Sequence, residues 1–471
     1  MKVLSHLNPK NVFKYFEEIC GIPHGSGNTS AISEYCCEFA KKHGLFYIKD
    51  ELNNVIIKKP AFKGYEEHPS IILQGHLDMV LEKEPDIEFD FSKDPISLKI
   101  EDDFIYANGT TLGGDDGIAV AMILAILEDK NLPAPMIEAL FTVDEETGMF
   151  GANGLDAIFL SSKRLINIDM EEEGFLTVGC AGGARADITI PLDKTNIECD
   201  FYEIVLDGLR GGHSGVEIDK GRLNANKILA KFLNSFDFEY LIADIEGGLK
   251  DNAIPRLSKA VIASKTNPDC YIKSFLKENT PPTDKGLKIT VSKIKSLNQA
   301  FSKDSTQKIV SFLNNVKNGI ISFSQNVKGL VETSLNLGVL KVENNNLFAT
   351  FAVRSSKNAA KTALLEELKT TALKFNGTIN THSFYPAWEY RENSFLRDKM
   401  SQVYFDLYNK KPQIMLIHAG LECGILGDKI ENLDAVSFGP DIFDVHTTQE
   451  HLSISSVERS YHYLCEVLKN L

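Results

Sequence analysis

The stretch Ile71-Ile72-Leu73-Gln74-Gly75-His76-Leu77-Asp78 decides the fold of this chain, because a short apolar run ends there in a histidine and an acid. Acidic or His residues also follow three further apolar runs, at residues 139–143, 165–168 and 435–438. Short apolar runs of this kind are typical of buried strands. The carboxyl ends of the strands in an open α/β sheet line the ligand crevice, so side chains from these distant segments are expected to converge there.

The pattern of predicted strands and helices in the middle of the chain differs from the pattern at its two ends. Up to Gly183, and again after residue 385, strand-like runs alternate with helical segments, which is typical of an α/β layer. Between these points the strands are longer and alternate apolar with polar residues, as in an α+β module. The sequence therefore predicts an α/β domain with a central mixed sheet flanked by helices, formed by residues 1–183 and 386–471, and an inserted α+β domain at residues 184–385. The helices expected are 9–19, 29–43, 117–127, 223–236, 303–317 and 394–408.

The composition excludes several classes of protein. The 471 residues include 50 Lys and Arg against 65 Asp and Glu, and the net charge of −15 would repel nucleic acid and anionic membrane surfaces. No apolar run approaches the roughly 20 residues that span a bilayer. The start of the chain has no secretory pattern, and the 8 Cys residues form no disulfide or zinc framework. We therefore expect a cytoplasmic protein with no nucleic-acid or membrane partner.

The residues after the predicted strands have the chemistry of a metal centre. Two histidines and several carboxylates, without a thiolate, suit Zn²⁺, Co²⁺ or Mn²⁺ in a nitrogen and oxygen site. Asp115 adds a further carboxylate from a glycine-flanked turn just before an apolar helix. If one carboxylate is shared between two ions, each ion keeps terminal ligands and a water, as in co-catalytic hydrolysis. The residues in question are His76, Asp78, Asp115, Glu145, Glu146, Asp169 and His446.

Two of these carboxylates suit second roles. Asp78 lies two residues after His76, on the same side of an extended segment, so it can hold the imidazole tautomer through the other ring nitrogen. Glu145, next to Glu146, suits a general base whose pKa the metal-bound water and the neighbouring acids tune. Each pattern alone is common in turns and on surfaces. Together they favour a metal site, because unrelated turns would not be expected to place His and acidic residues at the ends of four strands.

Several motifs resemble known families. Four of them are similar to the metal motifs of the aminoacylase and carboxypeptidase superfamily of co-catalytic zinc peptidases: residues 75–80 (GHLDMV), 112–117 (LGGDDG), 144–148 (DEETG) and 167–169 (NID). Four more resemble its aminoacyl-histidine dipeptidase branch: residues 211–215 (GGHSG), 252–256 (NAIPR), 333–338 (TSLNLG) and 418–424 (HAGLECG). The similarity runs from about Cys20 to Val457.

The resemblance implies a ligand set for two divalent ions per chain, with Zn²⁺ as the first choice and Co²⁺ or Mn²⁺ as alternatives. Asp115 would bridge the two ions. His76 and Asp169 would complete one ion, and Glu146 and His446 would complete the other.

The resemblance also matches Asp78 and Glu145 to the family's orienting acid and general base. Two departures from its pattern are visible. Asp116 stands where the branch usually has Asn, and residues 445–448 (VHTT) lack the usual small-residue and Ser-Pro surroundings of the last histidine. Neither departure removes a ligand, but the second leaves the loop geometry open.

In the family the inserted domain is a lid with substrate groups and dimer contacts, which implies a homodimer through this domain. His213 matches a histidine that polarises the scissile carbonyl, Arg354 an arginine that grips the terminal carboxylate, and Asn252 is a softer match. From the residues alone, a turn histidine that donates to backbone fits His213 as well, and a surface charge at a strand end fits Arg354 as well. His418 and Glu422 are four residues apart and could face one site. Glu422 is our fourth substrate-binding candidate, although a hydrogen bond at a helix N-terminus explains it nearly as well.

The leading hypothesis is a metal-dependent exopeptidase that hydrolyses the amide bond of small dipeptides. The expected substrates are of the aminoacyl-histidine type, such as β-alanyl-histidine, with a two-metal-activated water and Glu145 as base. An N-acyl amino acid deacylase or a broader di- or tripeptidase would use the same machinery. A non-catalytic binding protein of this fold predicts at least one broken ligand, whereas every ligand and acid-base position is filled here.

Overall fold

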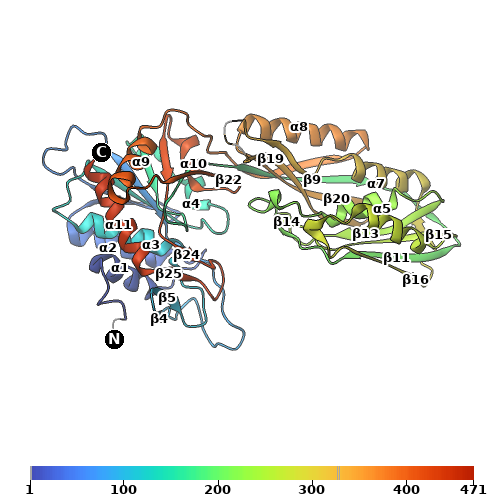
Figure 1. Cartoon of the computed structure of the whole chain (residues 1–471), viewed down its shortest axis with the longest axis horizontal. Helices are drawn as coiled ribbons and strands as arrows, with labels where there is room; N and C mark the ends of the chain where they lie inside the picture. Colours follow the sequence, from blue (N-terminus) through green and yellow to red (C-terminus); the bar gives the residue numbers. More distant parts are fainter. Residues whose placement is uncertain (1–2, 326, 328) are drawn as a thin grey trace. The chain divides into compact units, whose positions relative to one another are not determined.

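A computed structural model describes residues 3–325, 327 and 329–471 of the chain (Figure 1). The chain divides into two compact units. Unit 1 contains the residues up to Gly179 together with Tyr390–Leu416 and Leu421–Leu471. Unit 2 contains Cys180–Glu389 and the short segment Ile417–Gly420. Within the described residues, no helix is long and apolar enough to cross a membrane.

A mixed sheet forms the centre of unit 1. Its strands pair in the order β1-β2-β6-β3-β7-β23-β8-β22, and the central neighbours β6, β3, β7 and β23 run parallel. All residues of β3 and β6 are buried, as expected for parallel strands covered on both faces. The strands are β1 (Phe46–Lys49), β2 (Val55–Lys59), β3 (Ile71–His76), β6 (Ile137–Thr142), β7 (Arg164–Asn167), β8 (Phe175–Cys180), β22 (Gln413–Ile417) and β23 (Asp434–Ser437).

Helix α3 (Gly114–Glu128) lies at the centre of the core of unit 1, where it packs against β3 and α1. Every residue from Gly117 to Leu127 is buried, which explains why this helix is apolar on all sides. The other helices of unit 1 are α1 (Lys10–Cys20), α2 (Ser30–His43), α4 (Phe150–Gly154), α9 (Phe395–Tyr408), α10 (Glu422–Lys429) and α11 (Ile454–Lys469), with a short 3-10 helix at Ala157–Phe159.

A small second sheet in unit 1 holds the loop that carries His446. Strands β24 (Ile442–Phe443) and β25 (His451–Ser453) pair antiparallel, so residues 444–450 connect them as a hairpin loop. Strand β25 continues the sheet through β5 (Phe104–Ala107) to β4 (Leu98–Glu101). Strands β4 and β5 pair antiparallel, so residues 98–107 form a hairpin.

Unit 2 is built on an antiparallel sheet. Its main path runs β16-β11-β15-β13-β19-β20-β9-β21, and β18 pairs with β19 beside it. Helices α5 and α7 pack against each other, and α8 packs on β9 and β20. The main strands are β9 (Gly182–Pro191), β11 (Asp200–Asp207), β13 (Tyr240–Gly247), β15 (Ser258–Ser264), β16 (Lys288–Ile294), β18 (Gly319–Phe323), β19 (Val331–Glu343), β20 (Asn346–Ser355) and β21 (Thr378–Tyr385).

The remaining elements of unit 2 are short strands and helices. The strands form two small pairs, β10 (Lys194–Asn196) with β17 (Gln299–Phe301) and β12 (Gly212–His213) with β14 (Ala253–Ile254). The helices are α5 (Ala225–Leu233), α6 (Ile272–Asn279), α7 (Lys303–Asn315) and α8 (Asn358–Lys374), with 3-10 turns at Ile218–Lys220, Pro268–Tyr271 and Pro282–Asp284.

The predicted fold class is confirmed: a mixed, helix-flanked sheet accompanies a separate antiparallel module. The helix expected at 223–236 differs most from the expectation, since it forms only over Ala225–Leu233. The side chain of Asn224 accepts from the amides of Asn226 and Lys227 and so caps its start. The element α3 includes Gly114, but Asp115 and Asp116 have non-helical φ and ψ, so the regular helix starts at the expected Gly117.

Candidate metal centre

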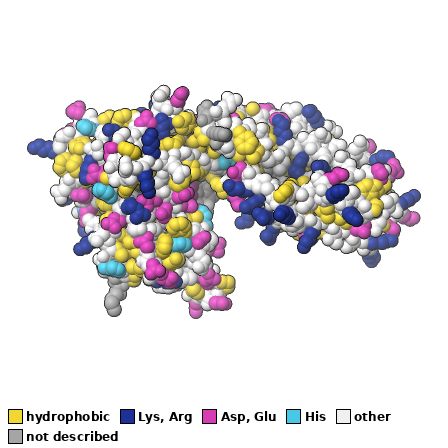
Figure 2. All heavy atoms as spheres, viewed as in Figure 1, with side chains coloured by type: hydrophobic (Ala, Val, Ile, Leu, Met, Phe, Trp, Pro, Cys, Tyr) yellow, Lys and Arg dark blue, Asp and Glu magenta, His cyan; other side chains and the backbone are white. Residues whose placement is uncertain are grey.

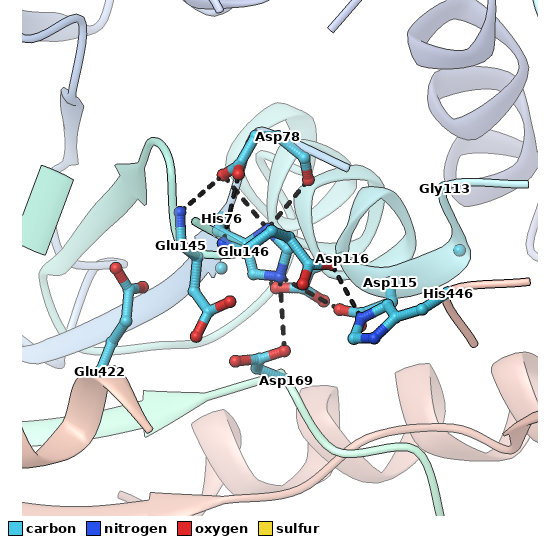
Figure 3. A network of polar contacts seen from close by, with 12 residues as sticks. His76, Asp78, Gly113, Asp115, Asp116, Glu145, Glu146, Asp169, Glu422 and His446 are labelled. Carbon is cyan, nitrogen blue, oxygen red and sulfur yellow. Dashed lines mark hydrogen bonds and ion pairs between the residues drawn. The ribbon is translucent and has the colours of Figure 1, made fainter. Parts of the chain in front are cut away.

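The parallel strands deliver the expected residues to one edge of the sheet of unit 1. His76 is the last residue of β3, Glu145 and Glu146 follow β6, and Asp169 follows β7. His446 comes from the loop between β24 and β25. Figure 3 draws these side chains around one centre, so the convergence expected from the strand ends is present.

Asp115 lies between the two histidines. Its Oδ1 is 3.1 Å from His76 Nε2, and its Oδ2 is 3.2 Å from His446 Nε2. His76 Nε2 also lies 3.6 Å from Asp169 Oδ1, and His446 Nε2 lies 3.0 Å from Glu146 Oε1. Each oxygen of Asp115 therefore contacts a different histidine, and each histidine contacts a further carboxylate, which is the arrangement expected of a shared carboxylate.

The backbone at the start of α3 places Asp115 in this position. Gly113 has a φ of 70°, which strains any other residue, and a Cβ there would lie 2.9 Å from Met79 Sδ, so Met79 would have to move. Asp115 and Asp116 have non-helical φ and ψ although the helix pattern includes them. Asp115 therefore projects from a turn rather than from the face of a regular helix.

Asp78 contacts the backbone of both glutamates and Ser26 in addition to His76, whereas the sequence predicted a contact with His76 alone. Its Oδ1 accepts from the amide of Glu145 at 3.0 Å, and its Oδ2 accepts from the amide of Glu146 at 3.3 Å and from Ser26 Oγ at 2.8 Å. The Nδ1 of His76 lies 2.9 Å from the backbone oxygen of Asp78 and 3.5 Å from its carboxylate. The backbone of this residue contacts the ring most closely, while its carboxylate fixes the turn that carries both glutamates.

Two buried acids close to the site were not among the candidates. Asp116 accepts from the amide of His76 at 3.1 Å, and Glu450 accepts from four amides at the start of α3. Asp116 stood out only as a departure from a family pattern. Glu450 carried no local signal, because its partners lie more than 330 residues away in the chain.

Glu422 is fully buried in unit 1 and is bound from the sheet. Its Oε2 accepts from Gln74 Nε2 and from Thr142 Oγ1, both at 2.6 Å, and burial raises its pKa to about 7. Gln74 in turn accepts from Asn167 Nδ2 at 2.6 Å. The hydrogen bonds come from side chains of β3 and β6 and not from a helix N-terminus, so the alternative explanation of Glu422 is wrong. Figure 3 shows its carboxylate beside that of Glu145.

The electrostatics of the cluster are dominated by burial and mutual contact. Burial opposes the charge on His76, but Asp115, Asp169 and Asp78 raise its pKa well above the usual range. Hydrogen bonds to Asp115 and Glu146 raise the pKa of His446 to about 11. Burial raises the pKa of Asp169 to about 6. The excess of carboxylates thus holds positive charge at both rings.

The pKa of Glu145 is also shifted by burial and by contact with neighbouring charges. Burial, followed by the neighbouring acids Asp169, Glu422 and Glu146, raises its pKa well above the ordinary value, while His76 acts in the opposite direction. A carboxylate whose pKa is raised towards neutrality is a stronger base for a proton transfer near pH 7.

The donor set fits divalent metal ions. Ligand atoms of His76, Asp115 and Glu146 all lie within 4.8 Å of one another, as do those of His76, Asp116 and Asp169. Zinc bonds of about 2.0–2.1 Å in a tetrahedral site separate neighbouring ligand atoms by about 3.3 Å. The four contacts from the imidazoles to carboxylate oxygens span 3.0–3.6 Å. Imidazole and carboxylate donors without a thiolate suit Zn²⁺, Co²⁺ or Mn²⁺.

The loop around His446 has its own supports despite the unusual residues beside the histidine. Thr447 Oγ1 donates to the backbone oxygen of Asp444 at 2.7 Å, and Thr448 Oγ1 donates to Glu84. The side chain of His446 is 48% exposed, whereas His76 is 1% exposed. The two histidines thus differ in access to solvent although both face Asp115.

Unit 2 brings together three cationic or basic side chains. Arg354 is 9% exposed and donates from Nη1 to Tyr385 OH at 2.7 Å, so the interpretation of a surface charge is wrong. His418 is buried beside it and contacts Ser334 Oγ through Nε2 at 2.7 Å. Burial and the charge of Arg354 lower the pKa of His418 to about 4. Burial and, second, the charge of Arg354 also lower the pKa of His213.

His213 has one ring nitrogen occupied by the turn. Its Nδ1 accepts from the amides of Gly215 at 3.3 Å and Val216 at 3.2 Å, so the neutral ring carries its proton on Nε2. The ring accepts from backbone, whereas a simple turn histidine would donate. Asn252 is exposed, and its neighbour Ala253 pairs with His213 in the β12–β14 ladder. Of the four substrate-binding candidates, His213, Asn252 and Arg354 belong to unit 2 and Glu422 belongs to unit 1.

Comparison with known proteins defines the class. Residues 72–470 match the model of peptidase family M20/M25/M40. The matched range contains the whole of unit 2 and the part of unit 1 from β3 onward. The chain belongs to this family and is therefore a peptidase, a hydrolase of peptide bonds.

Individual relatives cover the chain from end to end. The cytosol non-specific dipeptidase of Escherichia coli K12 is 37% identical over 100% of this chain and 99% of its own length. The crystal structure of aminoacylhistidine dipeptidase from Vibrio alginolyticus superposes with a TM-score of 0.91 at 34% identity, and the match covers 99% of this chain and 97% of that one. An aminopeptidase from Bacillus cereus shares the fold at 16% identity, with a TM-score of 0.59 over 98% of this chain and 99% of that one.

Proposed function

We propose that this protein is a dipeptidase with two divalent metal ions per chain, Zn²⁺ in the first place, and that it hydrolyses aminoacyl-histidine dipeptides such as β-alanyl-histidine. The observation that carries the proposal is the position of Asp115, with one carboxylate oxygen towards His76 and the other towards His446. The name of the Escherichia coli relative, a non-specific dipeptidase, supports dipeptides as substrates, and the name of the Vibrio alginolyticus structure, an aminoacylhistidine dipeptidase, supports a C-terminal His.

The residues that would hold the ions divide into two groups around Asp115. His76 and Asp169 form one group, and Glu146 and His446 form the other. When bound, such ions polarise a carbonyl and lower the pKa of a water molecule. The contacts of 3.0–3.6 Å within the groups support this division.

Glu145 is the general base in this proposal. Its carboxylate takes a proton from the attacking water and returns it to the nitrogen of the leaving amino acid. Asp78 holds the amides of Glu145 and Glu146 at 3.0 and 3.3 Å, which supports a fixed direction for each side chain. Two adjacent glutamates can then do different work, one as base and one as ligand.

The basic side chains of unit 2 suit two groups of a dipeptide, the carbonyl oxygen of the reacting amide and the terminal carboxylate. We assign His213 as a donor from Nε2 to the carbonyl oxygen, because its Nδ1 is already occupied by two amides. We assign Arg354 to the terminal carboxylate, because a buried guanidinium offers a forked set of donors to that group. Asn252 and Glu422 remain in the proposal as further substrate contacts. The proposal also includes a homodimer formed through unit 2 and a cytoplasmic location. The name of the Escherichia coli relative, a cytosol dipeptidase, supports the cytoplasmic location.

A substrate panel on metal-titrated protein tests the proposal. The panel contains β-alanyl-histidine, glycyl-histidine, glycyl-leucine, a tripeptide and N-acetyl-histidine, each assayed by release of the free amino acid. We expect the dipeptides with C-terminal His to be cleaved fastest and N-acetyl-histidine slowest. Preferred cleavage of N-acetyl-histidine would instead identify a deacylase, and no cleavage of any member at two bound ions per chain would contradict the enzyme.

A further inference from the structure

Glu450 makes an unusual set of contacts for a buried acid. It is 3% exposed, and its Oε2 accepts from the amides of Leu112 at 2.8 Å and Gly113 at 3.1 Å. Its Oε1 accepts from the amides of Gly114 at 2.8 Å and Asp115 at 3.2 Å. One carboxylate thus holds four consecutive amides of the segment that presents Asp115.

These amides have few alternative partners. The first amides of a helix lack an intrahelical acceptor, and the turn at Gly113 with its positive φ aims them in one direction. A Cβ at Gly114 would lie 3.2 Å from Glu450 Oε1, so the glycine allows the close approach of the carboxylate. The sequence of this turn and the contact with Glu450 therefore fit each other.

Glu450 also belongs to the loop that supplies His446. Both residues lie in the hairpin loop between β24 and β25, and the amide of Glu450 donates to the backbone oxygen of Thr447 at 3.2 Å. His446 contacts the side chain of Asp115 while Glu450 contacts its backbone amide. The loop therefore holds Asp115 at two points.

The choice of a carboxylate at this position has a cost that a neutral side chain would avoid. Burying a charge near Asp115 is unfavourable unless hydrogen bonds compensate it. Only a carboxylate offers two oxygens that each accept from two amides, since the NH₂ group of a glutamine cannot accept. A glutamate at position 450 can therefore accept from all four amides of residues 112–115 at once, which a glutamine cannot do.

We propose that Glu450 is a positioning residue that fixes the carboxylate of Asp115 relative to His446 and so sets the affinity of the metal centre. This inference rests on the proposed metal centre. It assigns Glu450 no contact with an ion or a substrate. Residues that orient metal ligands typically change metal affinity by about 10- to 100-fold when they are replaced.

Glu450→Gln is the test, with Glu138→Gln as the matched control. Glu138 is also buried in unit 1, at 0% exposed, and accepts from the amides of Ser161 and Ser162. It lies near the amino end of β6, whereas the site lies beyond the carboxyl end. The readouts are Zn²⁺ affinity by competition with a chelating dye, the visible absorption of the Co²⁺-loaded protein, and the melting temperature of the metal-free protein.

We expect Glu450→Gln to bind Zn²⁺ about 10- to 100-fold more weakly and to shift the Co²⁺ absorption bands. Glu138→Gln should lower the melting temperature and leave both metal readouts at wild-type values. A lower melting temperature with unchanged Zn²⁺ affinity and Co²⁺ bands in Glu450→Gln would show a purely structural role and overturn the inference.

Two further arms keep the test decisive. If Glu450→Gln does not fold, Glu450→Asp retains the charge with a side chain one methylene shorter, and wild-type metal affinity in that variant overturns the inference. The wild-type protein separates the two levels of the argument. Failure of the wild type to bind Zn²⁺ would overturn the proposed function and the inference with it, whereas equal affinity in wild type and variant overturns the inference alone.

Discussion

The two units of the chain differ in charge as well as in architecture. Unit 1 carries 23 Lys and Arg against 43 Asp and Glu, whereas unit 2 carries 27 against 22. On the face in Figure 2, acidic side chains are frequent over unit 1 and Lys and Arg side chains gather over unit 2. The buried clusters follow the same division: carboxylates surround two histidines in unit 1, and Arg354 lies with His213 and His418 in unit 2.

The difference teaches that the net charge of −15 is the sum of opposite values, −20 for unit 1 and +5 for unit 2. A cluster of carboxylates binds cations, and a buried guanidinium binds a carboxylate. A dipeptide carries one group of each sign. The predictions below test whether the acidic cluster acts through metal ions, whether Arg354 acts on the terminal carboxylate, and whether the two clusters are independent.

The largest effect is expected from Asp115→Ala, which should lose both ions and all measurable turnover. His76→Ala should mainly weaken one ion, because among the described residues Asp115 is the carboxylate that faces both histidines. Elemental analysis after gel filtration gives the number of ions per chain. Asp90→Ala, at an exposed acid of the same unit, serves as the control and should retain two. Two ions at wild-type affinity in Asp115→Ala would show that this carboxylate is not shared.

Glu145→Gln should keep the ions and lower kcat by about 10²- to 10⁴-fold, the usual contribution of a positioned general base. The amide of residue 145 still donates to Asp78, so the fold of the turn is retained. Single-turnover assays and metal analysis measure the two properties separately.

Glu146→Gln is the matched partner of that variant, because it should lose one ion and regain activity when excess metal is added. The reverse pattern, with metal rescue of Glu145→Gln alone, would mean that the base and the ligand are exchanged. Such an exchange would also contradict the contact of 3.0 Å between Glu146 Oε1 and His446 Nε2, because this contact places Glu146 among the ligand candidates.

Arg354→Lys should lower kcat/KM for dipeptides by about 10- to 150-fold, because hydrogen bonds to charged groups contribute about 1.5–3 kcal/mol. A dipeptide amide lacks the terminal carboxylate and should lose little further rate in the variant. Arg185→Lys, at an exposed ion pair with Asp251 in the same sheet, should leave both rates unchanged. Equal losses on the acid and on the amide would place the effect of Arg354 elsewhere than on the carboxylate.

The smallest effect on activity is expected from Ser302→Ala in unit 2. Ser302 Oγ accepts from the amide of Ser305 at 3.2 Å and caps α7, so its loss should cost about 1 kcal/mol of stability. Urea unfolding monitored by circular dichroism measures the cost, and the metal content and kcat should stay at wild-type values. A change in metal content would mean that the stability of unit 2 is coupled to the metal site of unit 1.

The sequence alone determined the features that depend on local order. Apolar runs followed by His76, Glu145, Glu146 and Asp169 could be identified, because strand length and the residues after a strand are local properties. The alternation of strands and helices, interrupted by longer strands, predicted the α/β domain and the separate α+β module for the same reason. Glycines around Asp115 marked a turn before a helix.

Only the tertiary structure decided which groups support these residues. Glu450 holds amides more than 330 residues away, and Glu422 accepts from side chains of β3 and β6, so neither role has a local signature. For Arg354 the residues alone left a substrate contact and a surface charge open, and only the structure shows that the side chain is buried against Tyr385. Burial and partner choice depend on which strands become neighbours. That arrangement is set by the packing of the whole chain, and no window of the sequence contains it.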